Sequence, residues 1–413
     1  MKISRFLLPI LFAGVAAAVD HDGFLNENPG GVYAVADGDT MTIENENFTN
    51  CYSVEEGGAI YVGTDATLEL KGSLMFADNF EFAVEEYGEW FGDANDVYLS
   101  SGATLVLNAE NAEDEITLGS GVDAFDTSGT GKIVKKGAGV ANLGGAGNTN
   151  DYSFFQGQLE IEQGTVVVKT DVNAVSAKIA DGASVVVQGG NCLNLAKDSL
   201  YNVVSAGAKE YDDENNLDAE GSLSGTEITR TSLRGGTLED VAFNVLVDGY
   251  VIDDLELNNS ILYLSGESAE LSNLVISADS SIVSSYTPST TTLSGANYLV
   301  LDSTSSDQLE GLTLVDGVVL TLGCTPNVLP SGEMGATVVF DVILNGLQIA
   351  ENANVTLAAG GVTTQSAELS INSWQVTEGG VSVSMSAKYV PEPATATLSL
   401  LALCGLAARR RRK

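Results

Sequence analysis

The stretch "GTGKIVKKGAGVANLGG" (129–145), followed by "GQLEIEQGTVVVK" (157–169), contains the pattern that decides the fold. Apolar residues alternate with polar ones over short runs, and glycines separate the runs. Alternation at period two is typical of a strand with one buried face, and glycine readily adopts the positive φ of a tight corner. We expect one set of side chains to point inward and stack in rows: Ile133, Val140, Leu143, Leu159, Ile161, Val166 and Val168.

Similar runs recur along the chain, each led by a turn residue. They are "DATLEL" (65–70), "GATLVL" (102–107), "GASVVV" (182–187), "NSILYL" (259–264) and "NANVTL" (352–357). Helical spacing of apolar residues is almost absent between the two ends, so the sequence predicts an all-β chain. The irregular spacing of the runs suits a parallel β-helix with insertions at its corners, but an antiparallel sandwich would show similar strands and turns.

Two local motifs favour the β-helix. "FTN" (48–50), "GGAI" (57–60) and "FADN" (76–79) resemble the GGAI and FxxN repeats of polymorphic outer-membrane proteins. Residues 129–169 resemble the autotransporter-associated β-strand repeat of passenger domains. Both families are right-handed β-helices exported to the cell surface, and the second resemblance implies corner positions for Gly131, Gly137, Gly139, Gly144, Gly157 and Gly164. The membrane barrel of an autotransporter is not found in this sequence, which implies export by the general secretion machinery.

The body divides at about residue 294. We expect a β-helix over residues 19–294. The segment "CTPNVLPSG" (324–332) interrupts the strand pattern with two prolines. Residues 295–389 are therefore expected to form a less regular or β-sandwich-like C-terminal region.

Both ends of the chain have the composition of targeting segments. Basic residues, an apolar run and the small residues Ala16 and Ala18 predict a signal peptide over residues 1–18. Near the other end, Pro391, Glu392 and Pro393 precede an apolar run that is shorter than the ~20 residues of a permanent anchor. A basic cluster closes the chain and would keep the far end in the cytoplasm: Arg409, Arg410, Arg411, Arg412 and Lys413.

The tail, residues 390–413, resembles the PEP-CTERM sorting signal of bacteria with a double envelope. This resemblance implies transient membrane insertion through a hydrophobic sorting helix. It also implies recognition by an exosortase, an integral-membrane cysteine transpeptidase that cuts near Pro391, Glu392 and Pro393. An ordinary tail anchor is the alternative. Both interpretations place the bulk of the protein outside the cytoplasm.

The charge balance excludes one class of partner. The chain has 56 Asp and Glu against 18 Lys and Arg, a net charge of −38, and both targeting segments are basic. Because nucleic-acid binding depends on clustered Lys and Arg, we expect no nucleic-acid partner.

Catalytic chemistry is weakly represented. The only histidine, His21, lies just after the predicted cleavage site, so we do not expect it to serve as a base for a distant nucleophile. Carboxylate pairs such as Asp253 and Asp254 most often decorate a solvated face. We expect Cys51, Cys192 and Cys324 to be small buried hydrophobes, and Trp90 and Trp374 to be core residues.

One acidic segment, "YDDENNLDAEG" (211–221), supplies oxygen ligands of the kind that Ca²⁺ takes. Leu217 stands where a calcium loop of the helix-loop-helix type would place its turn glycine, so we favour a solvated loop and no cofactor. A calcium site is the alternative, with Asp212, Asp213, Glu214, Asn215, Asn216 and Asp218 as its ligands.

The sequence as a whole predicts an exported, non-enzymatic protein of the cell surface, outer envelope or extracellular matrix, adhesin-like or structural, with an unknown ligand. The competing class is a secreted carbohydrate-active enzyme or carbohydrate-binding module on the same scaffold. A groove with converging carboxylates and exposed aromatic residues would favour the second class.

Overall fold

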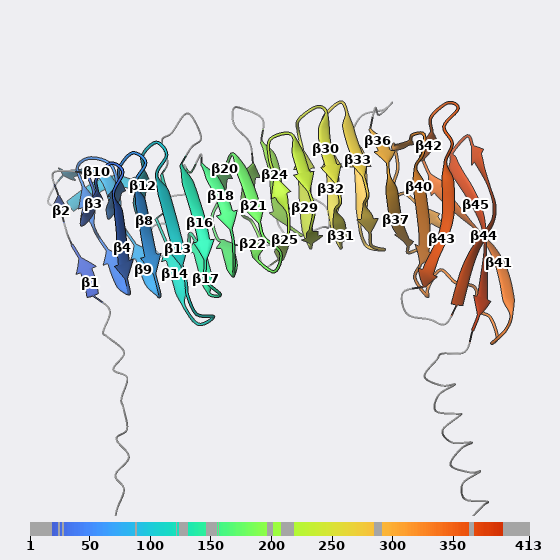
Figure 1. Ribbon diagram of the computed structural model, residues 1–413, viewed down its shortest axis with the longest axis horizontal. Helices are drawn as coiled ribbons and strands as arrows, with labels where there is room; N and C mark the ends of the chain where they lie inside the picture. Colours follow the sequence, from blue (N-terminus) through green and yellow to red (C-terminus); the bar gives the residue numbers. More distant parts are fainter. Residues whose placement is uncertain are drawn as a thin grey trace, which may run out of the picture.

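The computed structural model describes residues 19–23, 25–26, 29–86, 89–120, 122–123, 131–145, 155, 157–195, 201–207, 219–284, 291–362 and 367–390. These residues form strands, turns and bends. The described part of the chain contains no helix long and apolar enough to cross a membrane. The all-β prediction is confirmed. The strands stack side by side along one long axis, and the two ends of the described chain lie at opposite ends of that axis (Figure 1).

Two large sheets run along this stack. The 13-stranded sheet contains β4 (Thr40–Glu44), β8 (Thr67–Lys71), β13 (Thr104–Asn108), β16 (Lys132–Lys136), β18 (Gln158–Ile161), β21 (Ser176–Ile179), β26 (Glu227–Ile228), β27 (Ser232–Arg234), β30 (Tyr250–Asp253), β33 (Ala269–Ser272), β36 (Thr292–Ser294), β39 (Thr313–Leu314) and β42 (Gln348–Ile349). The 18-stranded sheet contains β1 (Val19–Asp22), β5 (Glu46–Thr49), β9 (Leu74–Ala77), β14 (Glu115–Leu118), β17 (Val140–Leu143), β19 (Thr165–Val168), β22 (Ser184–Gln188), β25 (Glu220–Ser224), β28 (Thr237–Glu239), β31 (Glu256–Asn258), β34 (Val275–Ile276), β37 (Ala296–Leu301), β38 (Ser305–Ser306), β40 (Val319–Cys324), β41 (Thr337–Asn345), β43 (Thr356–Val362), β44 (Ala367–Thr377) and β45 (Gly380–Tyr389).

Three smaller sheets complete the arrangement. A six-stranded sheet contains β20 (Val172–Ala174), β23 (Cys192–Leu195), β24 (Asn202–Ala206), β29 (Val241–Val245), β32 (Ile261–Leu264) and β35 (Ser281–Ser284). Two four-stranded sheets lie in the N-terminal part: β2 (Leu25–Asn26), β6 (Tyr52–Ser53), β10 (Phe80–Glu86) and β11 (Glu89–Ala94) form one, and β3 (Tyr33–Val35), β7 (Ile60–Val62), β12 (Val97–Leu99) and β15 (Val122–Asp123) form the other.

The chain visits these sheets in a repeating order, which we call a circuit. For example, β30, β31 and β32 lie in the 13-, 18- and six-stranded sheets, and β33, β34 and β35 repeat that order. Equivalent strands of neighbouring circuits pair in parallel. Thr40 pairs with Thr67 in the N-terminal part, whereas Val251 pairs with Glu270 further along. The predominance of parallel pairs decides against the antiparallel sandwich for the body of the protein.

Side chains from successive circuits form continuous inward rows. One row of the 18-stranded sheet contains His21, Phe48, Phe76, Leu118, Leu143, Val168 and Val187 in register. Six of the seven predicted inward residues are buried, and Val140 is the exception. Val140 pairs with Glu115 and Thr165 on the outer face, because the strand places Ala141 and Leu143 inward instead.

The turn residues that lead the predicted runs have the expected backbone conformation. Asp65, Gly102, Gly182, Asn259 and Asn352 all have φ between 45° and 76°. Such values are uncommon outside glycine, and asparagine and aspartate tolerate them better than other side chains.

The glycines of the quoted stretch have two different roles. Gly137, Gly144 and Gly164 have positive φ. Gly139 does not, but a Cβ there would overlap the carbonyl oxygens of Asp114 and Asn111. The backbone of the preceding circuit passes too close for a side chain, so glycine is needed at Gly139 for space rather than for its φ.

One circuit runs backwards, which the sequence analysis did not predict. Strands β24, β25 and β26 pair antiparallel with β23, β22 and β21 on one side, and with β29, β28 and β27 on the other. Because the chain reverses twice, the circuits before and after this segment run in the same direction.

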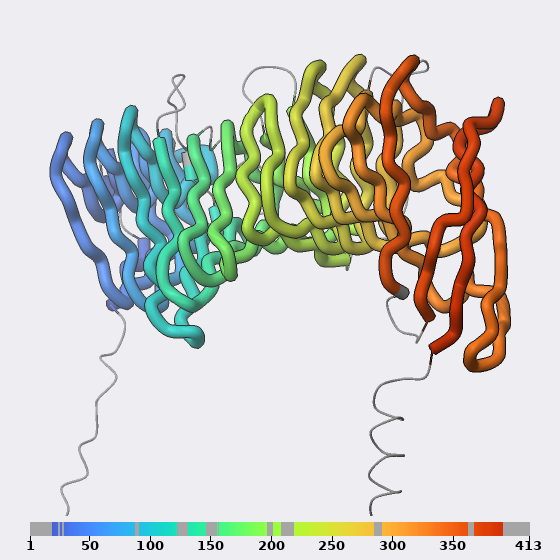
Figure 2. Tube along the Cα trace, turned by 45° about the vertical axis from the view of Figure 1, so that its right-hand side comes forward, coloured from blue at the N-terminus to red at the C-terminus, as the bar shows by residue number. Residues whose placement is uncertain are grey.

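The C-terminal end is closed by an antiparallel sheet, visible at the red end of the tube in Figure 2. Parallel pairing continues from β37 through β40 to β43, well beyond residue 295. The long strands β41, β45 and β44 then pair antiparallel, with Val342, Leu344, Val381, Val383 and Met385 buried beneath them.

Candidate functional site

Most of the predicted site residues lie outside the described residues. This holds for Ala16 and Ala18, for Pro391, Glu392 and Pro393, and for the basic cluster from Arg409 to Lys413. It also holds for the calcium candidates between Asp212 and Asp218. Elsewhere in the described chain, no group of three or more His, Cys, Asp or Glu side chains would hold a metal ion.

The only histidine has a structural position in the first circuit. The His21 ring stacks on Phe48, with centroids 4.9 Å apart, and Phe48 stacks on Phe76 at 4.6 Å. The His21 Nε2 lies 2.8 Å from a carboxylate oxygen of Glu46, which also accepts a hydrogen bond from the Tyr33 hydroxyl at 3.1 Å. His21 therefore covers the N-terminal end of an aromatic row.

The carboxylates Asp253 and Asp254 shape a corner. The Asp253 carboxylate accepts hydrogen bonds from Ser272 at 2.6 Å and Asn273 at 2.8 Å, in the next circuit. These bonds hold the pKa of Asp253 below its usual value. Asp254 occupies a corner position with φ 56°. Both residues have local structural roles.

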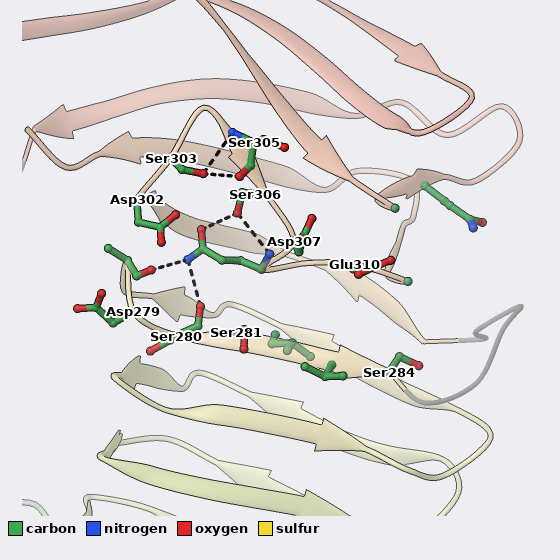
Figure 3. Close-up of a pocket in the computed structure, with 17 residues that line it drawn as sticks. Asp279, Ser280, Ser281, Ser284, Asp302, Ser303, Ser305, Ser306, Asp307 and Glu310 are labelled. Atoms are coloured by element: carbon green, nitrogen blue, oxygen red, sulfur yellow. Dashed lines mark hydrogen bonds between the residues drawn. The ribbon is translucent and has the colours of Figure 1, made fainter. Parts of the chain in front are cut away.

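A polar groove opens where the six-stranded sheet ends at β35. Its volume is about 580 Å³, and its walls are β35, the segment 302–311 and residues Gly346 and Gln348. Figure 3 shows Asp302, Ser303, Ser305 and Asp307 on one side and Asp279, Ser280 and Ser281 on the other. The labelled side chains are carboxylates, which accept hydrogen bonds, and hydroxyls, which both donate and accept them.

Gln308 joins the two walls of the groove. Its side-chain nitrogen donates to the backbone carbonyl oxygens of Ser280 and Val300, each at 3.1 Å, and its backbone carbonyl accepts from the Ile282 amide at 3.0 Å. Among the described residues, none of those that line the groove has an aromatic or a basic side chain. This described lining therefore suits hydroxyl-rich or cationic ligands and contains no aromatic platform for a sugar ring.

A buried lysine is the main charged group that the sequence analysis missed. Lys135 is fully buried, and its Nζ donates to the carbonyl oxygens of Lys136, Gly137 and Gln163 at 2.7, 2.8 and 3.3 Å. Desolvation lowers its pKa to about 8. The ammonium thus satisfies three carbonyl groups at a corner, and the signal for this was its inward place in the alternation of β16.

The remaining predictions concern sulfur and tryptophan. Cys51 and Cys324 are buried as expected, whereas Cys192 is only partly buried. Burial raises the pKa of Cys324 to about 11. The core prediction for Trp374 is wrong, because this side chain is 39% exposed on β44, beyond the part of the sheet that covers the stack. The side chain of Trp90 lies outside the described residues.

Comparison with known proteins identifies the tail. Residues 390–413 match the PEP-CTERM protein-sorting motif, which begins directly after β45. The protein is therefore an exported, cell-surface-associated protein that an exosortase sorts. No curated protein matches the chain.

Proposed function

We propose that the protein is a non-enzymatic structural or adhesin-like component of the cell surface, outer envelope or extracellular matrix of a double-envelope bacterium. In this proposal the stacked circuits form a right-handed parallel β-helix related to exported passenger domains. The observation that carries the proposal is the sorting motif directly after the last strand of an elongated stack. The general secretion machinery and an exosortase are the partners in its export.

The use of charged and amide side chains along the stack supports a structural role. Asn47 donates to Asp20 at 2.9 Å, Asn108 to Glu69 at 2.8 Å, and Lys132 to Glu160 at 3.1 Å. Each pair joins neighbouring circuits. These groups stabilise the wall of the stack, since polar pairs between adjacent strands contribute about 0.2–1 kcal/mol each.

Terminal-peptide mass spectrometry of the protein from fractionated native cells tests the proposal. We expect an N-terminus at Val19 and a C-terminus close to Pro391, Glu392 and Pro393, in the surface or matrix fraction. A chain intact through Lys413 in the inner membrane would show an anchored protein that faces the periplasm, and the proposal would then fail.

The carboxylates of the polar groove meet one of the two criteria for the competing class, and a carbohydrate-binding module is therefore the second candidate. Calorimetry with neutral and amino-sugar oligosaccharides tests it, with Asp302→Asn as the groove variant. Asp316→Asn is the control, because Asp316 is not among the residues that line the groove. Binding that Asp302→Asn weakens and Asp316→Asn leaves unchanged would support this candidate; equal binding by both variants would exclude the groove.

A further inference from the structure

The fold ends one residue before the sorting motif. Tyr389 is the last residue of β45, and the motif starts at Val390. The Tyr389 amide donates to the Ala336 carbonyl at 3.0 Å, and its carbonyl accepts from the Gly335 amide at 2.8 Å. On the other side Tyr389 pairs with Ala367 of β44. The backbone of the final strand residue is therefore held from both sides.

The Tyr389 side chain is also held. Its hydroxyl donates to the carbonyl oxygen of Pro330. A Cβ at Gly332 would overlap the Tyr389 ring, so the ring lies directly against the backbone at Gly332. A side chain at position 332 would displace the ring. The contact thus requires glycine at one partner and an aromatic ring with a hydroxyl at the other.

The segment that contacts Tyr389 is itself fixed to the core. The Thr325 amide donates to the Leu301 carbonyl at 2.9 Å, and the Val328 amide donates to the Thr325 carbonyl at 3.2 Å. Val328 is 7% exposed, and Leu329 packs against the core cluster. This is the proline-containing segment that interrupts the strand pattern. Pro326 lies within this anchored turn, and the chain that follows brings Pro330 and Gly332 to the end of β45.

We propose that Pro330, Gly332 and Tyr389 form a clasp that fixes the first residue available to the exosortase. A transpeptidase needs an extended, unpaired peptide, and backbone paired on both sides is protected until it opens locally. The clasp keeps β45 paired through Tyr389 and leaves Val390, the first residue of the motif, outside the paired strand. Tyr389 is then a positioning residue for the sorting reaction, and this role rests on the sorting by exosortase stated above.

Trypsin cleavage after Lys388 measures the clasp without any exosortase. Lys388 pairs with Thr337 and Glu368, so its peptide bond to Tyr389 is protected while β45 stays paired. In the purified full chain we expect Tyr389→Ala and Gly332→Val each to raise the cleavage rate at this bond at least tenfold. Val381→Ala is the matched control, because it removes buried contacts from the opposite end of the same strand. Equal rates in the wild type and both clasp variants, or an equal rise in the control, would overturn the clasp.

The same variants in native cells test the positioning role. The wild type should give one mature C-terminus at or beyond Val390, whereas Tyr389→Ala should give additional ends upstream of Val390. A variant with wild-type ends and wild-type processing rate would refute the positioning role even if trypsin detects the clasp. If the wild type itself is not processed, sorting by exosortase fails, and the trypsin comparison still decides whether the clasp exists.

Discussion

The buried Lys135 makes the stability of the protein depend on pH in a way that can be calculated. Its pKa is about 8 in the folded protein against 10.5 as the ordinary value. Between these two pH values the unfolded chain binds the proton more fully than the folded chain does. Unfolding then takes up protons, and the free energy of unfolding rises with pH in this window.

The size of the effect follows from the pKa difference. Each unit corresponds to ~1.4 kcal/mol, so the total change from Lys135 is about 3 kcal/mol. Replacing Lys135 by methionine keeps an unbranched side chain, one heavy atom shorter, and removes the ionisable group. We therefore expect the free energy of unfolding of the wild type, minus that of Lys135→Met, to increase by about 3 kcal/mol from pH 8 to 10.5.

Urea unfolding of both proteins at half-unit pH steps measures this difference and cancels the titration of all other groups. Lys132→Met is the control, because Lys132 lies on the same strand with a half-buried side chain that contacts Glu160. The rise with pH should be specific to Lys135→Met, because Lys135 is the fully buried one of these two lysines. A flat or falling difference for Lys135→Met would refute the argument that desolvation dominates at this site.

Three further predictions concern packing and ionisation. Gly58→Ala places a Cβ against the backbone of Asn95 and Phe80 and should lower the free energy of unfolding by about 1–3 kcal/mol. Gly182→Ala has open space around it but a φ of 76°, and it should lower the free energy of unfolding by ~1 kcal/mol. Urea unfolding of the two variants compares these values. Phe48→Ala removes a fully buried ring from the aromatic row and should cost about 3–5 kcal/mol in the same assay. Because the pKa of Cys324 in the folded protein is raised from 9.0 to about 11, its contribution to stability is present below pH 9 and is lost as the pH rises through 11. A thiol reagent at pH 8 should modify Cys324 only after the protein unfolds. Rapid labelling of the native protein would contradict the burial of this thiol.

The local pattern of the sequence predicted strands and corners well. Alternating apolar residues placed Leu159, Ile161, Val166 and Val168 inward, because a strand has only two faces and one of them is buried. The error at Val140 came from placing Val140 and Leu143 on the same face. Residues three positions apart in a strand point to opposite faces, and only Leu143 of the two points inward.

A longer repeat was present and was not recognised. "GGVYAV" (30–35) and "GGAIYV" (57–62) are 27 residues apart and become the paired strands β3 and β7. The glycines recur because the backbone of the next circuit leaves no room for a Cβ at Gly31 or Gly58. Reading both segments together would have given the length of the first circuit.

The reversed circuit and the groove were beyond the reach of the sequence pattern. Strands of the reversed circuit, such as β25, alternate in the same way as their parallel neighbours, since parallel and antiparallel strands share the two-residue period. The groove forms because β35 is the last strand of the six-stranded sheet. Where a sheet ends depends on tertiary packing, which no short motif encodes. Lys135 followed the alternation, but its burial depends on three carbonyl groups, one of which comes from the next circuit.

The strands lie across the long axis of the stack, so the hydrogen bonds between circuits point along that axis (Figure 1). A pull applied between the two ends of the stack would load these bonds one row at a time. Bonded partners in neighbouring circuits are 19 residues apart in the central part and 27 in the N-terminal part. Each released circuit would lengthen the chain by roughly 65 to 95 Å at about 3.5 Å per residue. Under tension between its ends the protein would therefore extend in discrete steps, and each step would lower the force that the remaining circuits bear.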